Sequence, residues 1–125
     1  MVQNIDFAPT FMSAAGIPVP EDIQGESIMP LLQGKNEEWD REAVYYHYYE
    51  YPGVHAVRKH HGIVNEDYKL VKFYGEDIDE WELYDRKKDT LEPNNVYNYE
   101  SYADVVKDLK IELAELRKNT KTLMN

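Results

Sequence analysis

The 125-residue sequence contains no cysteine. This absence excludes a disulfide, a thiolate metal site and a cysteine nucleophile. Without cysteines, the sequence does not indicate whether the protein works in an oxidising or a reducing compartment. Long apolar runs are also missing, since no stretch approaches the roughly 20 apolar residues that span a bilayer. The N-terminus lacks the basic and then apolar segments of a signal peptide. We therefore expect one modest soluble domain, with no address for export or for a membrane.

Positive charge is scarce, because 14 Lys and Arg residues stand against 24 Asp and Glu residues. Residues 1–40 carry seven acids and one base, and residues 76–100 carry nine acids and three bases. Residues 41–75 and residues 101–125 each carry five bases and four acids, and all four histidines lie in the first of these two ranges. A phosphate backbone would be repelled by most of this surface, so nucleic acid is not an expected partner.

Aromatic residues are concentrated in the centre of the chain, where five of the eleven tyrosines lie between Tyr45 and His61. Rings occupy both parities of residues 44–51, which favours an interior strand covered on both faces. Residues 54–58 are compatible with a second strand. Further strands are predicted to begin at Gly62 and to cover residues 68–74 and 81–85. The sequence therefore predicts an antiparallel sheet of three to four strands.

Helical segments flank this sheet. A short helix is predicted from Asn4 to Gly16, with Asp6 as its cap and Gly16 at its left-handed end. An extended, proline-rich connector follows, and a boundary is expected near residue 40. A long helix is predicted from Ser101 onward, because apolar residues recur there at helical spacing. The fold class is α+β, with parts at 1–40 and 41–125.

The order of five motifs is more specific than any single one. These are residues 5–11 (IDFAPTF), 15–20 (AGIPVP), 24–32 (QGESIMPLL), 67–71 (DYKLV) and 81–95 (WELYDRKKDTLEPNN). Together they resemble the C-terminal portion of an arylsulfatase-type, formylglycine-dependent sulfatase. Arg86 and Thr90 replace the Leu and Pro that are usual in the closing motif. Residues 49–63 are most similar to the N-acetylglucosamine-6-sulfatases and related glycosaminoglycan sulfatases.

The resemblance implies a sulfuric ester hydrolase of two parts. Its N-terminal domain would hold a formylglycine, made in a Cys/Ser-x-Pro-x-Arg motif, and a calcium ion. Residues 1–40 would be the tail of that domain, and residues 41–125 would be the C-terminal subdomain that closes the active site. None of Ser13, Ser27 and Ser101 is followed by x-Pro-x-Arg. We therefore expect no catalytic residue, cofactor or metal site here, and no activity from this chain alone. Such a parent enzyme is expected in the periplasm or outside the cell.

The candidate substrate-binding residues are His55, Arg58, His60 and His61. In the family that this sequence resembles, the segment faces the substrate. Cationic and hydrogen-bond donor groups there suit a sulfate or a sugar hydroxyl. The simpler interpretation is a set of sheet-edge residues without a ligand. A metal site is not expected, because neighbouring residues such as His60 and His61 point to opposite faces of a strand.

The expected partners are the missing N-terminal domain and a sulfated glycan, and an exposed apolar face could also support a homo-oligomer. One alternative is a free-standing, non-catalytic module that binds carbohydrate or protein and derives from a sulfatase C-terminus. A remnant without a function of its own is a third possibility.

Overall fold

The computed structural model describes residues 1–54, 56–75, 77–92 and 94–120. The chain divides into two compact units with a break between Glu42 and Ala43. We describe each unit by itself. No helix among the described residues has the length and apolar character needed to cross a membrane.

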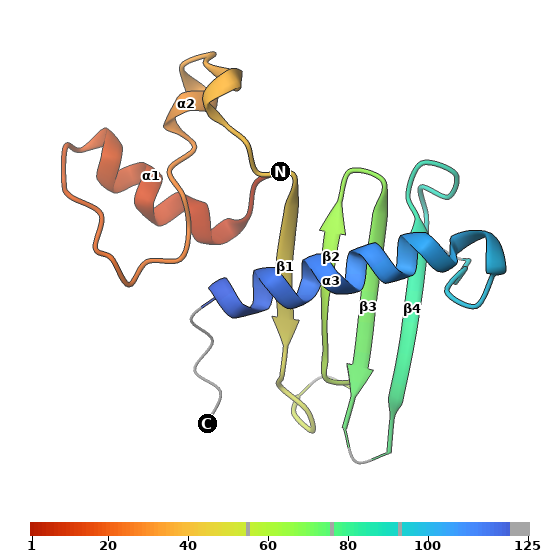
Figure 1. The fold of residues 1–125 in the computed structure, drawn as a ribbon. Coiled ribbons are helices and arrows are strands. Elements are labelled where there is room, and N and C mark those ends of the chain that lie inside the picture. Colours follow the sequence, from red (N-terminus) through yellow and green to blue (C-terminus); the bar gives the residue numbers. More distant parts are fainter. Residues whose placement is uncertain (55, 76, 93, 121–125) are drawn as a thin grey trace. The chain divides into compact units, whose positions relative to one another are not determined.

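The second unit is a four-stranded antiparallel meander backed by a helix. The strands are β1 (Ala43–Tyr48), β2 (His60–Asn65), β3 (Tyr68–Tyr74) and β4 (Asp79–Asp85), in the spatial order β1-β2-β3-β4. A short 3₁₀ turn, η3 (Glu100–Tyr102), leads into α3 (Ala103–Asn119), which lies across one face of the sheet (Figure 1). This arrangement confirms the predicted α+β class, the antiparallel sheet and the long C-terminal helix.

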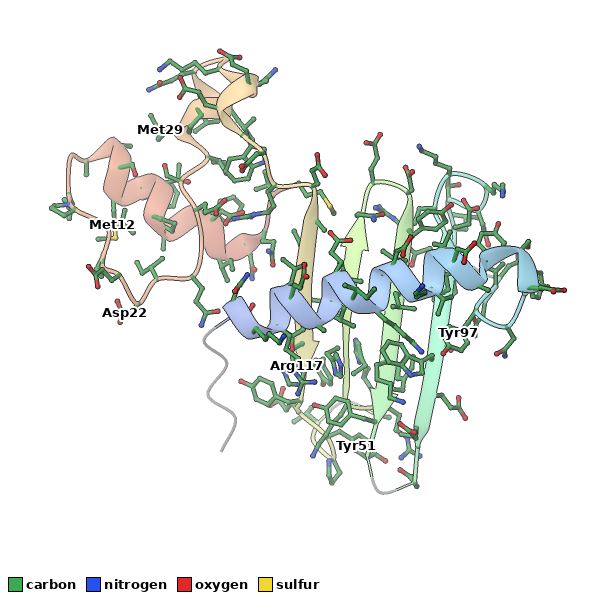
Figure 2. The ribbon with its side chains drawn as sticks, viewed as in Figure 1. Met12, Asp22, Met29, Tyr51, Tyr97 and Arg117 are labelled. Carbon is green, nitrogen blue, oxygen red and sulfur yellow. The ribbon has the colours of Figure 1, made fainter. Side chains whose placement is uncertain are left out.

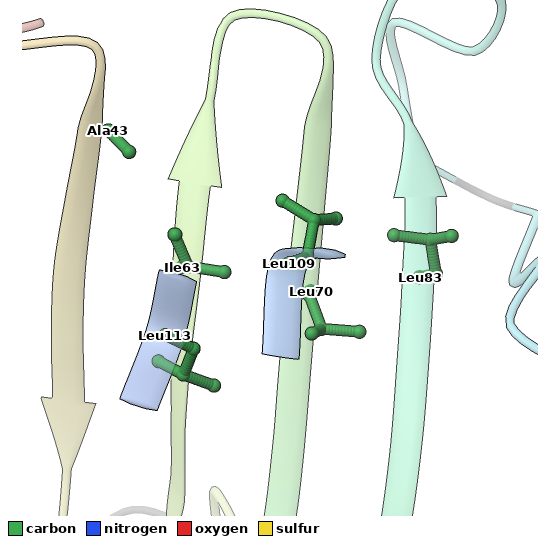
Figure 3. Packing of buried hydrophobic residues seen from close by; sticks show 6 residues of the cluster. All are labelled: Ala43, Ile63, Leu70, Leu83, Leu109 and Leu113. Atoms are coloured by element: carbon green, nitrogen blue, oxygen red, sulfur yellow. The ribbon is translucent and has the colours of Figure 1, made fainter. Parts of the chain in front are cut away.

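The core lies between this helix and the sheet. The register places Tyr45 opposite Ile63, Ile63 opposite Leu70 and Leu70 opposite Leu83. Three of these side chains are fully buried, and α3 adds two leucines to the same cluster (Figure 3): Ile63, Leu70, Leu83, Leu109 and Leu113. Alternation along the strands therefore puts one parity in the core and the other on the opposite face.

The face opposite α3 is closely packed around Gly62. A Cβ atom at this residue would lie 2.3 Å from the backbone oxygen of Leu70 and 2.9 Å from Cε1 of Tyr46. The ring of Tyr46 therefore lies directly against the glycine, where no side chain fits.

Two strand predictions are wrong. β1 is at the edge of the sheet, although rings on both of its faces had indicated an interior strand. Aromatic residues on both faces of a strand indicate that both faces are covered. A strand can be covered on both faces and still have a hydrogen-bonded neighbour at only one of its edges. Residues 54 and 56–58 form no strand, and Val54 is 95% exposed, because the β1–β2 pairing leaves them in a connection.

The first unit contains η1 (Asn4–Asp6), α1 (Phe7–Ala14), α2 (Met29–Leu32) and η2 (Asn36–Glu38). Gly16 has a φ of 69°, in the left-handed region that the sequence predicted. Asp6 is not the expected side-chain cap of α1. Its buried carboxylate instead accepts hydrogen bonds from the backbone of Gln3 and Glu26 and from the guanidinium of Arg41.

Candidate functional site

Two connections meet at one end of the sheet. The register pairs Tyr48 with His60 and Tyr74 with Asp79. The described residues of the β1–β2 connection (49–54 and 56–59) and of the β3–β4 turn (75, 77 and 78) therefore lie at the same end of the sheet. The predicted residues Arg58, His60 and His61 lie on or next to the first of these connections. His55, the fourth predicted residue, lies outside the described part of the chain. We name this end of the sheet the loop end.

Arg58 reaches across the loop end to the β3–β4 turn. Its Nη1 donates to Oδ1 and Oδ2 of Asp77 at 2.6 and 2.5 Å. The guanidinium carbon lies 4.9 Å from the ring centre of Tyr51. The hydrogen bond from Arg58 to Asp77 raises the pKa of the guanidinium, against the opposing effect of desolvation. The ion pair therefore directs the Arg58 guanidinium toward the β3–β4 turn.

His60 lies on the face opposite α3. Its ring stacks with Tyr48, with centres 5.5 Å apart, and contacts Phe73 at 5.3 Å. Nδ1 is 2.8 Å from the backbone oxygen of Arg58. Because a carbonyl oxygen only accepts, Nδ1 carries the proton in this contact. Nε2 then remains as the atom with which this ring could contact a ligand.

His61 lies on the other face, in a cluster of rings near the end of α3. Its ring centre is 5.8 Å from that of His47, 6.4 Å from Tyr45 and 5.4 Å from Tyr74. Nε2 of His47 lies 2.5 Å from the hydroxyl oxygen of Tyr74. The figure of side chains shows Arg117 at the C-terminal end of α3 (Figure 2). Burial first, and then the positive charge of Arg117, lowers the pKa of His61 to about 4.

The lowered pKa of His61 predicts a loss of stability toward acid. The ordinary value is 6.5, so the unfolded chain takes up a proton between about pH 6.5 and pH 4 while the folded ring stays neutral. The free energy of unfolding should fall by about 1–2 kcal/mol from pH 7 to pH 4.5, allowing for solvent screening. Urea unfolding at a series of pH values would measure this slope.

The matched variant for this prediction is His61→Asn, which keeps a polar side chain but cannot titrate. It should flatten most of the slope above pH 4.5. The remaining part should come from His47, since burial lowers its pKa as well. An unchanged slope in His61→Asn would show that His61 is not the group responsible.

The structure thus brings Arg58 and His60 to the loop end and separates His60 from His61 by the thickness of the sheet. Asp77, Tyr51 and Tyr74 were not among the predicted site residues. Charge complementarity between Arg58 and the acidic residues of the β3–β4 turn was the only available signal for Asp77. Among the described residues, no group of three or more His, Asp or Glu side chains could hold a metal ion.

Several solved structures contain the same fold. The chain matches a protein solved in complex with its substrate D-glucosamine-2-N,6-O-disulfate, with 49% identity, a TM-score of 0.86 and coverage of 94% of this chain and 24% of that one. It also matches a 2-O glycosaminoglycan sulfatase with 26% identity, a TM-score of 0.77 and coverage of 94% and 25%. The first was solved with a sulfated sugar and the second is a sulfatase, and this fold makes up about a quarter of each chain.

The sequence comparisons give the family. Residues 1–119 match the model of the N-sulphoglucosamine sulphohydrolase C-terminal family, and the chain belongs to this family. It is 50% identical to the N-acetylglucosamine-6-O-sulfatase of Bacteroides thetaiotaomicron over 121 residues, which is 94% of this chain and 21% of that protein. The chain therefore spans about a fifth of the length of this relative. The resemblance that the five motifs predicted is confirmed.

Proposed function

We propose that this chain is the C-terminal subdomain of a sulfuric ester hydrolase that acts on sulfated glycans. The observation that carries the proposal is the match of residues 1–119 to the family, together with 50% identity to an N-acetylglucosamine-6-O-sulfatase. Within such an enzyme the loop end would close the active site and contact the substrate. The parent enzyme would work in the periplasm or outside the cell, where sulfated glycans are found.

The catalytic centre is assigned to the larger part of such an enzyme. Formylglycine requires a Cys or Ser in a Cys/Ser-x-Pro-x-Arg motif, and this sequence has neither a cysteine nor a serine in that context. In the part of the chain that the structure describes, no group of three or more His, Asp or Glu side chains could hold a metal ion. Sulfuryl transfer develops negative charge that needs a metal or clustered cations around an oriented nucleophile. In this proposal the residues of this chain therefore carry out no chemical step.

The proposed tail (1–40) lies within the first unit, which extends two residues further, to Glu42. Phe7 and Phe11 of α1 are 51% and 71% exposed. An eight-residue helix with two exposed phenylalanines is suited to packing against a further domain. The partner that we propose for it is the N-terminal domain of the sulfatase. Self-association through the same surface stays a prediction.

Of the predicted contact residues, His60 has the geometry that suits a sulfated sugar best. Nδ1 already donates to the backbone oxygen of Arg58, which leaves Nε2 as the ring nitrogen that can contact the sugar or its sulfate group. His61 lies among rings on the other face with a lowered pKa, so it is neutral at pH 7. We assign contact to His60 and support of the loop end to His61.

A chimeric enzyme tests this proposal. The matching C-terminal residues of the Bacteroides N-acetylglucosamine-6-O-sulfatase would be replaced by this chain, and hydrolysis of 6-sulfated N-acetylglucosamine would be measured. We expect the chimera to be active and the isolated chain to be inactive. Substituting His60→Gln in the chimera should lower kcat/KM by roughly tenfold, which is the loss of one hydrogen bond to a charged group.

Lys87→Ala is the matched control, because Lys87 pairs with Asp67 on the surface and outside the loop end. This substitution should leave kcat/KM within about twofold of the chimera, as is usual for a surface ion pair. A folded but inactive chimera would contradict the proposed closure of the active site. An active chimera that is indifferent to His60→Gln would remove His60 from the substrate contacts.

A further inference from the structure

Arg58, Asp77 and Tyr51 form a constellation at the loop end that the proposed sulfate contact does not use. In the described contacts, the Asp77 carboxylate accepts hydrogen bonds from one nitrogen of the guanidinium, Nη1. The guanidinium carbon lies over the ring of Tyr51. Tyr51 projects from the β1–β2 connection beyond the end of the strands (Figure 2). The three side chains therefore present donors, acceptors and an aromatic ring together.

The charge of this constellation does not favour a sulfate. Arg58 and Asp77 carry opposite charges, so their sum is zero. Because both carboxylate oxygens are within 2.6 Å of Nη1, an incoming anion would meet a neutralised cation and an adjacent negative charge. The side chains are 39% and 60% exposed, so water weakens both effects without changing their sign. A free arginine would bind an anion better than this pair.

A neutral hydroxyl group fits the constellation well. A guanidinium has five N–H donors, and the described contacts with Asp77 leave those of Nε and Nη2. A carboxylate offers about four lone-pair positions, of which Nη1 occupies two. Two neighbouring hydroxyls of a sugar can each accept from Nε or Nη2 and donate to the carboxylate. The ring of Tyr51 provides apolar surface beside them.

We propose that Tyr51, Arg58 and Asp77 form a subsite for neighbouring hydroxyl groups of the glycan, separate in role from the sulfate contact at His60. The inference rests on the proposed function and deepens it. Arg58 then binds hydroxyl groups in the unsulfated part of the sugar. Asp77 orients the Arg58 guanidinium and, by neutralising its charge, makes it prefer a neutral group.

The test is a titration of the full 125-residue chain followed by NMR of backbone amides and of the Arg58 Nε–H group. The probes are N-acetylglucosamine, N-acetylglucosamine-6-sulfate and sodium sulfate. Both sugars should shift the signals of Tyr51, Arg58 and Asp77, and sulfate alone should not. Asp77→Asn keeps the shape but removes the charge, and it should weaken binding of the unsulfated sugar about fivefold, since a hydrogen bond to a charged group becomes a neutral one.

The same substitution should let sodium sulfate shift the Arg58 signal, because the neutralising charge has gone. Asp79→Asn is the matched control. Asp79 is the first residue of β4 and pairs with Lys72 of β3, so this substitution should leave sugar binding unchanged. Unweakened binding of the unsulfated sugar by Asp77→Asn, or a response of the unaltered Arg58 to sulfate alone, would overturn the hydroxyl subsite and leave the proposed function intact.

Two further results are decisive. If the sulfated sugar shifts His60 but not Tyr51, Arg58 or Asp77, the subsite is wrong and the substrate contact at His60 stands. If neither sugar shifts any signal of the loop end, the proposed substrate contacts fail and the subsite fails with them.

Discussion

Replacing Gly62 with alanine is expected to lower the free energy of unfolding by at least about 3 kcal/mol, the upper range for inserting one methyl group into a packed region. The new Cβ atom would lie 2.3 Å from the backbone oxygen of Leu70 and 2.8 Å from the hydroxyl oxygen of Tyr46. Leu70 belongs to the neighbouring strand, so relief of the first clash requires β2 and β3 to separate where they are paired. Urea unfolding monitored by circular dichroism would measure the loss.

The matched control is Gly53→Ala in the β1–β2 connection. There the nearest atom would be the backbone oxygen of Glu50 at 3.3 Å, so a small local shift is enough and the cost should stay below about 1 kcal/mol. The double variant Gly62→Ala/Tyr46→Ala separates the two clashes. It should not recover stability, because the backbone oxygen of Leu70 remains. Stability of Gly62→Ala within 1 kcal/mol of the unaltered chain would contradict this close approach.

Much of the sheet could be predicted from the sequence, because its strands follow the period of two. β3 has the predicted bounds of Tyr68 and Tyr74, and the long helix follows from apolar residues at helical spacing. The position of β1 in the sheet could not be predicted in this way. Periodicity reports which faces are buried, whereas the place of a strand in the sheet depends on its pairing partners, which lie far away in the sequence.

The candidate site was predictable only in part, for the same reason. The opposite directions of His60 and His61 follow from alternation along one strand. The pair of Arg58 and Asp77 joins residues 19 positions apart on two different connections, and it exists only because β2 and β3 fix those connections at one end of the sheet. The lowered pKa of His61 likewise depends on side chains brought together by the fold.

Asp6→Asn is expected to destabilise the first unit by about 3–5 kcal/mol, as when one partner of a buried ion pair is removed. The Asp6 side chain is fully buried and accepts four hydrogen bonds: from Nη1 of Arg41 at 2.6 Å, from Nη2 at 3.0 Å, and from the backbone nitrogens of Gln3 and Glu26 at 2.7 and 3.0 Å. An asparagine would keep one acceptor oxygen and turn an NH₂ group toward donors. Of the two carboxylates that pair with Arg41 among the described residues, the exposed Glu26 would then be the one that stays charged.

Hydrogen exchange resolved by peptide would measure this change, with faster exchange expected in residues 3–41. Burial alone would raise the pKa of Asp6, but the hydrogen bonds from Arg41, Gln3 and Glu26 outweigh it and lower the pKa below 3.8. The stabilisation by Asp6 is therefore present above about pH 4 and is lost as the pH falls further, so exchange should be compared at pH 7.

Glu26→Gln is the matched control, because it removes the partner of Arg41 that is 61% exposed and should cost no more than about 1 kcal/mol. The double variant Asp6→Leu/Arg41→Met tests the physical reason. It removes both charges together, so it should be less destabilising than Asp6→Asn, since no uncompensated charge stays buried. Equal effects of Asp6→Asn and Glu26→Gln would show that the buried carboxylate does not hold this unit together.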